Sequence, residues 1–219
     1  MNMNFELARF NMVEQQVRPW EVLDPRVLQV LENVHREDFV PIRFRKLAFA
    51  DLSIPLPADQ FMMSPKIEGR MLQSLALKDD ESVLEIGTGS GFITACLSGM
   101  ARRVVSVEVF EELHVEAANR LQDKHMHNVE LYVGDVMAGW RPEQAHDVVV
   151  VTGSAPEVPD MFREWVNPGG RLFIVTGDSP AMEARLLTRL SASDWREESL
   201  FETDLGRLVN ADHAPQFSF

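Results

Sequence analysis

The clearest signal in this sequence is Val83-Leu84-Glu85-Ile86-Gly87-Thr88-Gly89-Ser90-Gly91, a short apolar run followed by three glycines at alternate positions. The next residues, 92–97, are typical of the start of a helix. A buried strand, a tight turn and a helix N-terminus form the unit on which α/β proteins bind nucleotide-like ligands. Glycine permits positive φ angles and lets a ligand approach the backbone closely. The turn therefore predicts a binding site that includes Glu85, Gly87, Thr88, Gly89 and Gly91.

The glycine spacing indicates which kind of ligand the turn binds. In the dinucleotide fingerprint, two residues separate the second and third glycines, whereas this chain has Glu-x-Gly-x-Gly-x-Gly. This pattern resembles the first motif of S-adenosylmethionine-dependent methyltransferases. S-adenosyl-L-methionine has no pyrophosphate, and its sulfonium and ammonium groups favour a nearby carboxylate, for which Glu85 is the candidate. A glycine-rich turn without a ligand is the alternative at this point.

Composition bounds the class of protein. The chain has 219 residues, of which 45% are hydrophobic and 25% charged, as in an ordinary soluble globular domain. No apolar run approaches the roughly 18 residues of a membrane span, and the N-terminus lacks the pattern of a secretory signal. The single cysteine, Cys96, excludes an internal disulfide. We expect a cytoplasmic protein without membrane contact, and the net charge of -13 argues against binding nucleic acid.

The N-terminal third is predicted to be mostly helical. Apolar residues recur at helical spacing over residues 5–17, and a second helix follows Asp24-Pro25. A short helix is expected over residues 42–49, and Ser64-Pro65 marks the N-terminus of another. We interpret residues 1–78 as a helical cover with a substrate loop, and residues 79–219 as the cofactor-binding core of the same single domain.

Strands and helices alternate after the glycine turn. Strands are expected at 104–108, 129–133, 147–152 and 171–175, helices at 111–124, 161–165 and 181–191, and a turn at 167–170. The tail, residues 195–219, is predicted to hold two or three short strands. This alternation predicts an α/β fold with a doubly wound, mostly parallel seven-stranded sheet, the Rossmann-like methyltransferase architecture.

Acidic residues end successive predicted strands. Glu108 lies 108 − 85 = 23 positions after Glu85, close to the interval of about 20 at which an acidic residue meets ribose hydroxyls. Asp135 closes the next strand, where it would accept a hydrogen bond from an adenine amino group while Val136 packs on the ring. A solvated strand end is the alternative for each acid taken alone. His125-Met126-His127 lacks further ligands in sequence, so we expect a surface loop and no metal site.

Several motifs resemble the protein-L-isoaspartate O-methyltransferase family over most of the chain. They are Val34-His35-Arg36-Glu37-Asp38-Phe39-Val40-Pro41, Ala48-Phe49-Ala50-Asp51, Ile54-Pro55-Leu56, the glycine turn, Ser106-Val107-Glu108, Gly134-Asp135, Gly139-Trp140, Ala155-Pro156-Glu157-Val158-Pro159 and Pro168-Gly169-Gly170-Arg171-Leu172. The resemblance implies a protein-repair transferase that methylates a carboxylate of isoaspartyl residues in damaged proteins or peptides.

The chain departs from the family in the substrate loop. The family usually has Gly-x-Gly-Gln-Thr-Ile-Ser-x-Pro, whereas this chain reads Pro57-Ala58-Asp59-Gln60-Phe61-Met62-Met63-Ser64-Pro65. Phe61 replaces the threonine and Met63 the serine, while Ser64 is displaced by one position and also fits a helix N-cap. A substrate carboxylate is ionised at neutral pH, so it needs positioning more than a base. Gln60 and Ser64 are the candidate catalytic residues that would hold it.

Two other functions stay open. Phe61, Met62 and Met63 could line a pocket for a more apolar small-molecule acceptor, although plain core packing explains them equally well. The chain could also be a non-catalytic S-adenosylmethionine-binding protein that has lost its substrate groups. The sequence does not indicate the oligomeric state.

Overall fold

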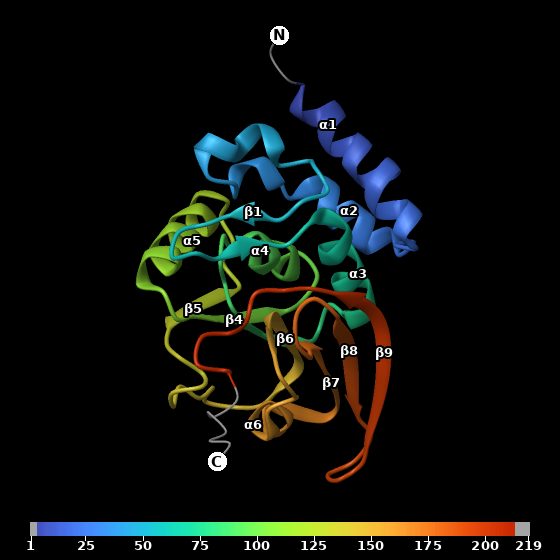
Figure 1. The fold of residues 1–219 in the computed structure, drawn as a ribbon, viewed down its shortest axis with the longest axis vertical. Coiled ribbons are helices and arrows are strands. Elements are labelled where there is room, and N and C mark those ends of the chain that lie inside the picture. The colour runs from blue at the N-terminus through green and yellow to red at the C-terminus, as the bar shows by residue number, and fades with distance from the viewer. Residues whose placement is uncertain (1–3, 213–219) are drawn as a thin grey trace, which may run out of the picture.

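The computed structural model describes residues 4–212 and contains a seven-stranded sheet in the order β5-β4-β3-β6-β7-β8-β9 (Figure 1). Strands β5, β4, β3, β6 and β7 are parallel, while β8 and β9 run antiparallel to their neighbours. The strands are β3 (Ser82–Ile86), β4 (Arg103–Glu108), β5 (Val129–Val133), β6 (His146–Ala155), β7 (Val166–Thr176), β8 (Met182–Arg189) and β9 (Trp195–Thr203). The predicted mostly parallel seven-stranded α/β sheet is confirmed.

The direction of winding reverses at β3. From β3 the chain first moves outward through β4 and β5, and it then returns to add β6 on the other edge of β3. All five residues of β3 are buried, and so are Val148–Val151 of β6. Near-continuous β-branched runs are typical of parallel strands covered on both faces. The carboxyl ends of β3, β4 and β6 meet at this switch point, where open α/β sheets bind their ligands.

Helices flank the sheet, and the N-terminal helices cover one end of the molecule (Figure 1). The α-helices are α1 (Phe5–Met12), α2 (Pro25–Asn33), α3 (Pro65–Leu75), α4 (Phe92–Ser98), α5 (Glu111–Asp123) and α6 (Asp160–Glu164). A π-helix (Val13–Val17) and three 3-10 helices (Arg18–Trp20, Arg36–Asp38 and Ile42–Leu47) complete the cover. Asp24 caps α2 as predicted, since its side chain accepts a hydrogen bond from the Arg26 N–H. Val17 and Leu31 of the cover share one apolar cluster with Val83 of β3.

The helix predicted over residues 181–191 is wrong, because this segment forms β8. Its sequence is rich in Ala, Leu, Met, Glu and Arg, which favour helices intrinsically. It nevertheless lies between β7 and β9 and pairs with both. Met182, Ala184 and Leu187 turn toward the core. Tertiary pairing on both edges therefore overrides the local propensity.

Two smaller predictions are corrected at the same end of the sheet. The turn expected at residues 167–170 is a bulge within β7, where pairing with β6 skips from Val166 to Arg171. The tail forms one long strand, β9, instead of two or three short strands, followed by an isolated bridge between Ser154 and Arg207. Residues 213–219 of the predicted tail lie outside the described residues.

The substrate loop is a small hairpin in front of the sheet. Strands β1 (Ile54–Pro55) and β2 (Phe61–Met62) pair antiparallel, and the Gln60 N–H bonds the Pro57 carbonyl across the turn. The two central residues, Ala58 and Asp59, have φ angles of 56° and 54°. This left-handed region is unfavourable for residues with a Cβ atom.

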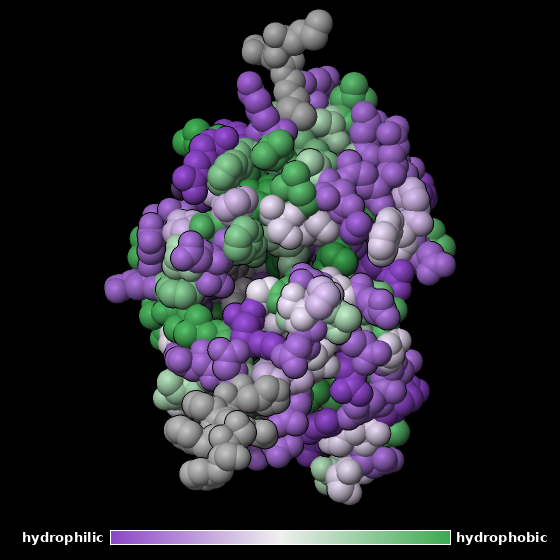
Figure 2. All heavy atoms as spheres, viewed as in Figure 1, coloured by the Kyte–Doolittle hydropathy of each residue, from purple (hydrophilic) through white to green (hydrophobic). Residues whose placement is uncertain are grey.

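The surface is uneven in polarity. Figure 2 shows hydrophobic side chains gathered over the N-terminal helices, whereas the part over β8 and β9 is mostly hydrophilic. Within residues 4–212, no helix has the length and the apolar character needed to cross a membrane.

Candidate active site

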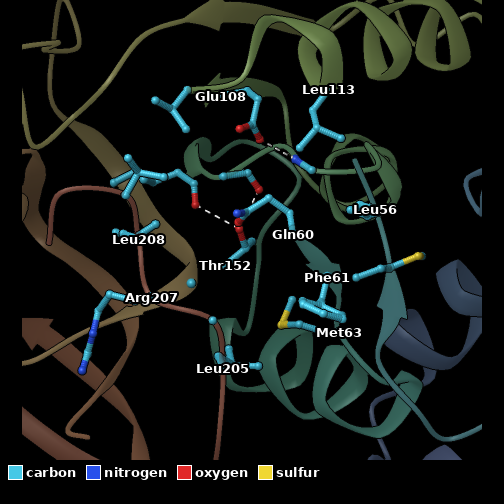
Figure 3. Close-up of a pocket in the computed structure, with 18 of the residues that line it drawn as sticks. Leu56, Gln60, Phe61, Met63, Glu108, Leu113, Thr152, Leu205, Arg207 and Leu208 are labelled. Atoms are coloured by element: carbon cyan, nitrogen blue, oxygen red, sulfur yellow. Dashed lines mark hydrogen bonds between the residues drawn. The ribbon is translucent and has the colours of Figure 1, made fainter. Parts of the chain in front are cut away.

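A cavity of about 620 Å³ lies at the carboxyl ends of β3, β4 and β6 (Figure 3). The glycine turn, Glu108 and residues 134–136 form one part of its wall. The β1–β2 hairpin and the chain after β9, residues 204–209, form the opposite part. In Figure 3, Glu108 lies at one end of the cavity, and Phe61 and Met63 lie at the other. The cavity thus joins the predicted cofactor residues to the predicted substrate loop.

The glycine turn exposes its backbone to this cavity. Gly87, Gly89 and Gly91 have φ angles of 97°, 53° and 86°, respectively. A Cβ atom on Gly87 would overlap with the hydroxyl of Thr152, so the turn requires glycine there. Gly87 and Gly89 line the cavity. Gly91 precedes α4, and a Cβ atom on it would lie 3.2 Å from Ala117 of α5.

Glu108 is held by the backbone and still has free acceptor capacity. Its Oε2 accepts the Gly89 N–H at 2.8 Å, and its Oε1 accepts the Phe110 N–H at 3.1 Å. The residue is only 5% exposed, and it lines the cavity. A carboxylate offers about four lone-pair sites, so about two remain for other donors. This arrangement suits a pair of ribose hydroxyls.

Asp135 and Val136 form the next part of the wall. Asp135 Oδ1 accepts the Met137 and Ala138 N–H groups at 2.8 and 3.1 Å. Its Oδ2 accepts Asn210 Nδ2 at 2.6 Å, which leaves one lone-pair site free on that oxygen. Val136 is buried and lines the cavity beside it. One acceptor next to an apolar side chain suits the amino group and the ring of adenine.

Glu85 does not reach the cavity, although the sequence placed it at the methionine end of the cofactor. Its Oε2 accepts hydrogen bonds from Thr94 Oγ1 at 2.5 Å and Ser106 Oγ at 2.7 Å. Thr88 joins this buried network, because its hydroxyl lies 2.6 Å from that of Ser106. Burial raises the pKa of Glu85 to about 8, and the nearby Glu108 adds to the shift. Glu85 is therefore mostly protonated at neutral pH and lies beneath the turn.

The two candidate catalytic residues occupy different positions. Gln60 lines the cavity and donates one N–H to the Ala58 carbonyl at 3.0 Å, so its amide has hydrogen-bonding capacity left. Phe61 beside it is 59% exposed and also lines the cavity. Ser64 precedes α3 at the N-cap position, but its side chain makes no capping bond, and it does not line the cavity.

Sequence reasoning missed two parts of the wall. Thr152 directly follows the buried residues 148–151 of β6, and its hydroxyl donates to the Gly87 carbonyl oxygen at 2.6 Å. The chain after β9 is held against β6, since the Ser154 N–H donates to the Gly206 carbonyl and the Leu208 N–H donates to the Ser154 carbonyl, both at 2.9 Å. Thr152 is a polar residue that directly follows a run of four valines, and this pattern could have indicated it as a cavity residue. The segment after β9 carried no recognisable motif.

The donor and acceptor groups fit S-adenosyl-L-methionine. The cavity offers one free acceptor at Asp135, about two at Glu108 and the backbone of the glycine turn, in that order along its wall. The side-chain-free glycines leave room for a ligand that touches the backbone. Within the described part of the chain, no group of three or more His, Cys, Asp or Glu side chains could hold a metal ion.

The doubly wound sheet, the glycine turn and the acids at successive strand ends define the class of protein, an S-adenosylmethionine-dependent methyltransferase. The model of the family "Protein-L-isoaspartate(D-aspartate) O-methyltransferase" matches residues 9–198. The chain belongs to this family.

Similar proteins cover nearly the whole chain. The "Protein-L-isoaspartate O-methyltransferase" of Rhodopseudomonas palustris is 36% identical over 202 residues, covering 92% of this chain and 93% of that protein. The "Protein-L-isoaspartate O-methyltransferase 2" of Pelobacter propionicus is 37% identical over 210 residues, covering 95% and 93%. A solved structure from Plasmodium falciparum, described as a beta-aspartate methyltransferase in complex with S-adenosyl-L-homocysteine, has a TM-score of 0.82 and 17% identity and covers 95% of this chain and all of its own. At that identity it supports the fold alone.

Proposed function

We propose that this protein transfers a methyl group from S-adenosyl-L-methionine to a carboxylate of isoaspartyl residues in damaged proteins or peptides. The observation that carries the proposal is one continuous cavity, lined by the strand-end acids on one side and by the substrate hairpin on the other. The family match over residues 9–198 supplies the reaction class.

The cofactor supplies a methyl group on a positively charged sulfur. The chain's own residues bind and orient the reactants: Asp135 and Val136 hold the adenine, Glu108 the ribose, and the glycine turn the methionine end. An acceptor carboxylate is already ionised, so no residue needs to remove a proton. Positioning of the two reactants is then the main contribution of the protein.

The acceptor carboxylate would contact the hairpin side of the cavity. Gln60 is the proposed hydrogen-bond donor, because it lines the cavity and has a free amide hydrogen. Ser64 is a weaker candidate, because reaching the carboxylate would require movement of the segment before α3. Phe61 and Met63 can contribute only their backbone groups to such a contact.

One observation favours a second acceptor class. Phe61 is 59% exposed and faces the cavity, where an aromatic ring would bind an apolar methyl acceptor. Methyl transfer to small apolar compounds, and none to isoaspartyl peptides, would support this second function.

The test is methyl transfer from labelled S-adenosyl-L-methionine to an isoaspartyl peptide, with the matching normal aspartyl peptide as the control. We expect label on the isoaspartyl peptide alone. Binding of S-adenosylhomocysteine without methyl transfer to the isoaspartyl peptide would refute the proposed acceptor. The cytoplasmic location and the absence of nucleic-acid and membrane partners stay predictions from the sequence.

A further inference from the structure

A side pocket of about 50 Å³ adjoins the main cavity beneath the substrate hairpin. The two spaces share part of their lining, including Met63, Gly87 and Thr152. The glycine turn forms one wall of the side pocket, and the carboxylate-bearing residue Glu68 of α3 lines it as well. Glu68 does not line the main cavity, and no motif in the sequence singled it out.

Glu68 is a buried acid with one satisfied and one unsatisfied oxygen. The residue is 1% exposed. Its Oε2 pairs with Arg36 Nη1, whereas its Oε1 has no hydrogen-bond partner among the described residues. A buried carboxylate oxygen without a donor is costly, and such groups call for an explanation.

Within residues 4–212, the carboxylate of Glu68 receives a side-chain hydrogen bond from Arg36 alone. Arg36 is fully buried, and it donates its Nε–H to the Ala48 carbonyl at 2.8 Å and one Nη2–H to the Met63 carbonyl at 2.7 Å. Its guanidinium also stacks on Phe92, 5.0 Å from the ring centroid. These contacts fix Arg36 in place, so the free oxygen of Glu68 is available to a ligand in the side pocket.

The shape and chemistry of the side pocket indicate a small cationic donor. A carboxylate oxygen accepts charge-assisted hydrogen bonds from an ammonium group. The side pocket lies next to Gly87, beyond Glu108 and Asp135 in the order of the proposed ribose and adenine contacts. The part of S-adenosyl-L-methionine that follows the ribose is its amino-acid end, which carries an ammonium group. We propose that Glu68 binds the α-ammonium of the cofactor, an inference that rests on the proposed function.

This assignment replaces the acid expected from the glycine motif. Both acids have one unpartnered oxygen among the described residues, but Glu85 lines neither the cavity nor the side pocket, and two hydroxyls already occupy its Oε2. Glu68 carries an unpartnered oxygen and faces the space beside the turn. Burial raises the pKa of the Glu68 carboxyl, whereas the charge and the hydrogen bond of the adjacent Arg36 oppose this rise and favour the ionised form.

The experiment compares two ligands by calorimetry in wild-type and Glu68→Gln proteins. S-adenosylhomocysteine carries the amino-acid end, and 5′-methylthioadenosine lacks it. We expect Glu68→Gln to weaken binding of S-adenosylhomocysteine at least about tenfold, as for loss of one hydrogen bond to a charged group, and to change binding of 5′-methylthioadenosine less than about twofold. The matched control is Glu37→Gln, which breaks the buried Arg9–Glu37 pair, 2.6 Å long, and leaves the cavity untouched.

Three results would overturn the inference. If Glu68→Gln weakens binding of both ligands equally, Glu68 only shapes the site. If binding of both ligands is unchanged, the free oxygen of Glu68 contacts water and no ligand group. If wild-type protein binds no S-adenosylhomocysteine, the proposed function fails as well. Should Glu68→Gln not fold, the double variant Arg36→Met with Glu68→Met removes both charges together, and it should lose the preference for S-adenosylhomocysteine in the same way.

Discussion

Replacing Glu108 by alanine should abolish the ribose contact of the cofactor. Two of the four lone-pair sites on the carboxylate are taken by the Gly89 and Phe110 N–H groups, which leaves about two for the ribose hydroxyls. Each hydrogen bond to a charged group contributes about 1.5–3 kcal/mol, so the loss is about 3–6 kcal/mol. We therefore expect Glu108→Ala to weaken S-adenosylhomocysteine binding by roughly 10² to 10⁴-fold.

Isothermal titration calorimetry measures this loss directly, with thermal unfolding as a check that the variant is folded. The matched control is Glu112→Ala, which removes an exposed acid from the first turn of α5. A folded Glu108→Ala protein that binds S-adenosylhomocysteine within about fivefold of wild type would refute the reasoning, because the expected loss of two hydrogen bonds is far larger.

Three further changes test other parts of the structure. Ala58→Gly should raise the free energy of unfolding in urea by about 0.5–1 kcal/mol, since glycine removes the left-handed strain but gains unfolded-state entropy; a lower stability would contradict this. Because the pKa of Glu85 is raised to about 8 in the folded protein, its protonated carboxyl contributes to the free energy of unfolding. This contribution is complete below about pH 4.5 and is lost as pH rises through about 8. Glu85→Gln should therefore flatten the fall in unfolding free energy over that window, and an unchanged slope would show that another group causes it. Gly153→Ala would place a Cβ atom 2.9 Å from a terminal methyl of Leu208 and 3.2 Å from the Gly206 carbonyl oxygen, and the crowded backbone of Gly206 should shift the segment after β9. We therefore expect kcat/KM for the acceptor peptide to fall by about tenfold or more, whereas unchanged kinetics would exclude a role for this wall.

The central part of the fold could be predicted because local pattern and tertiary environment agree there. Strands β3 and β4 and residues 148–151 of β6 are rich in β-branched residues and buried, and the glycines of the turn have positive φ angles. The same agreement placed Glu108, Asp135 and Val136 on the cavity wall, because parallel strands end at one edge of the sheet. Whether these three residues contact the cofactor stays a prediction.

Other features depend on contacts that no local pattern records. The β8 segment has a helical composition, and only its pairing with β7 and β9 makes it a strand. Glu85 was expected at the ligand, but its side chain points to Thr94 of α4 on the covered face of the sheet. The signal for Glu68 was present as an acid on the buried stripe of α3, between Ile67 and Met71. Only its pairing with Arg36, 32 residues earlier, shows that one oxygen of Glu68 is satisfied and the other is not.

The measurement that tests the account most directly is a competition between two peptides in one reaction. An isoaspartyl peptide and its normal aspartyl counterpart, at equal concentration, are incubated with the protein and S-adenosyl-L-methionine, and methylation of each is followed by mass spectrometry. The account predicts a methyl ester on the isoaspartyl peptide alone, and none with Glu108→Ala at the same cofactor concentration. Equal methylation of both peptides, or of neither while S-adenosylhomocysteine binds, would contradict it.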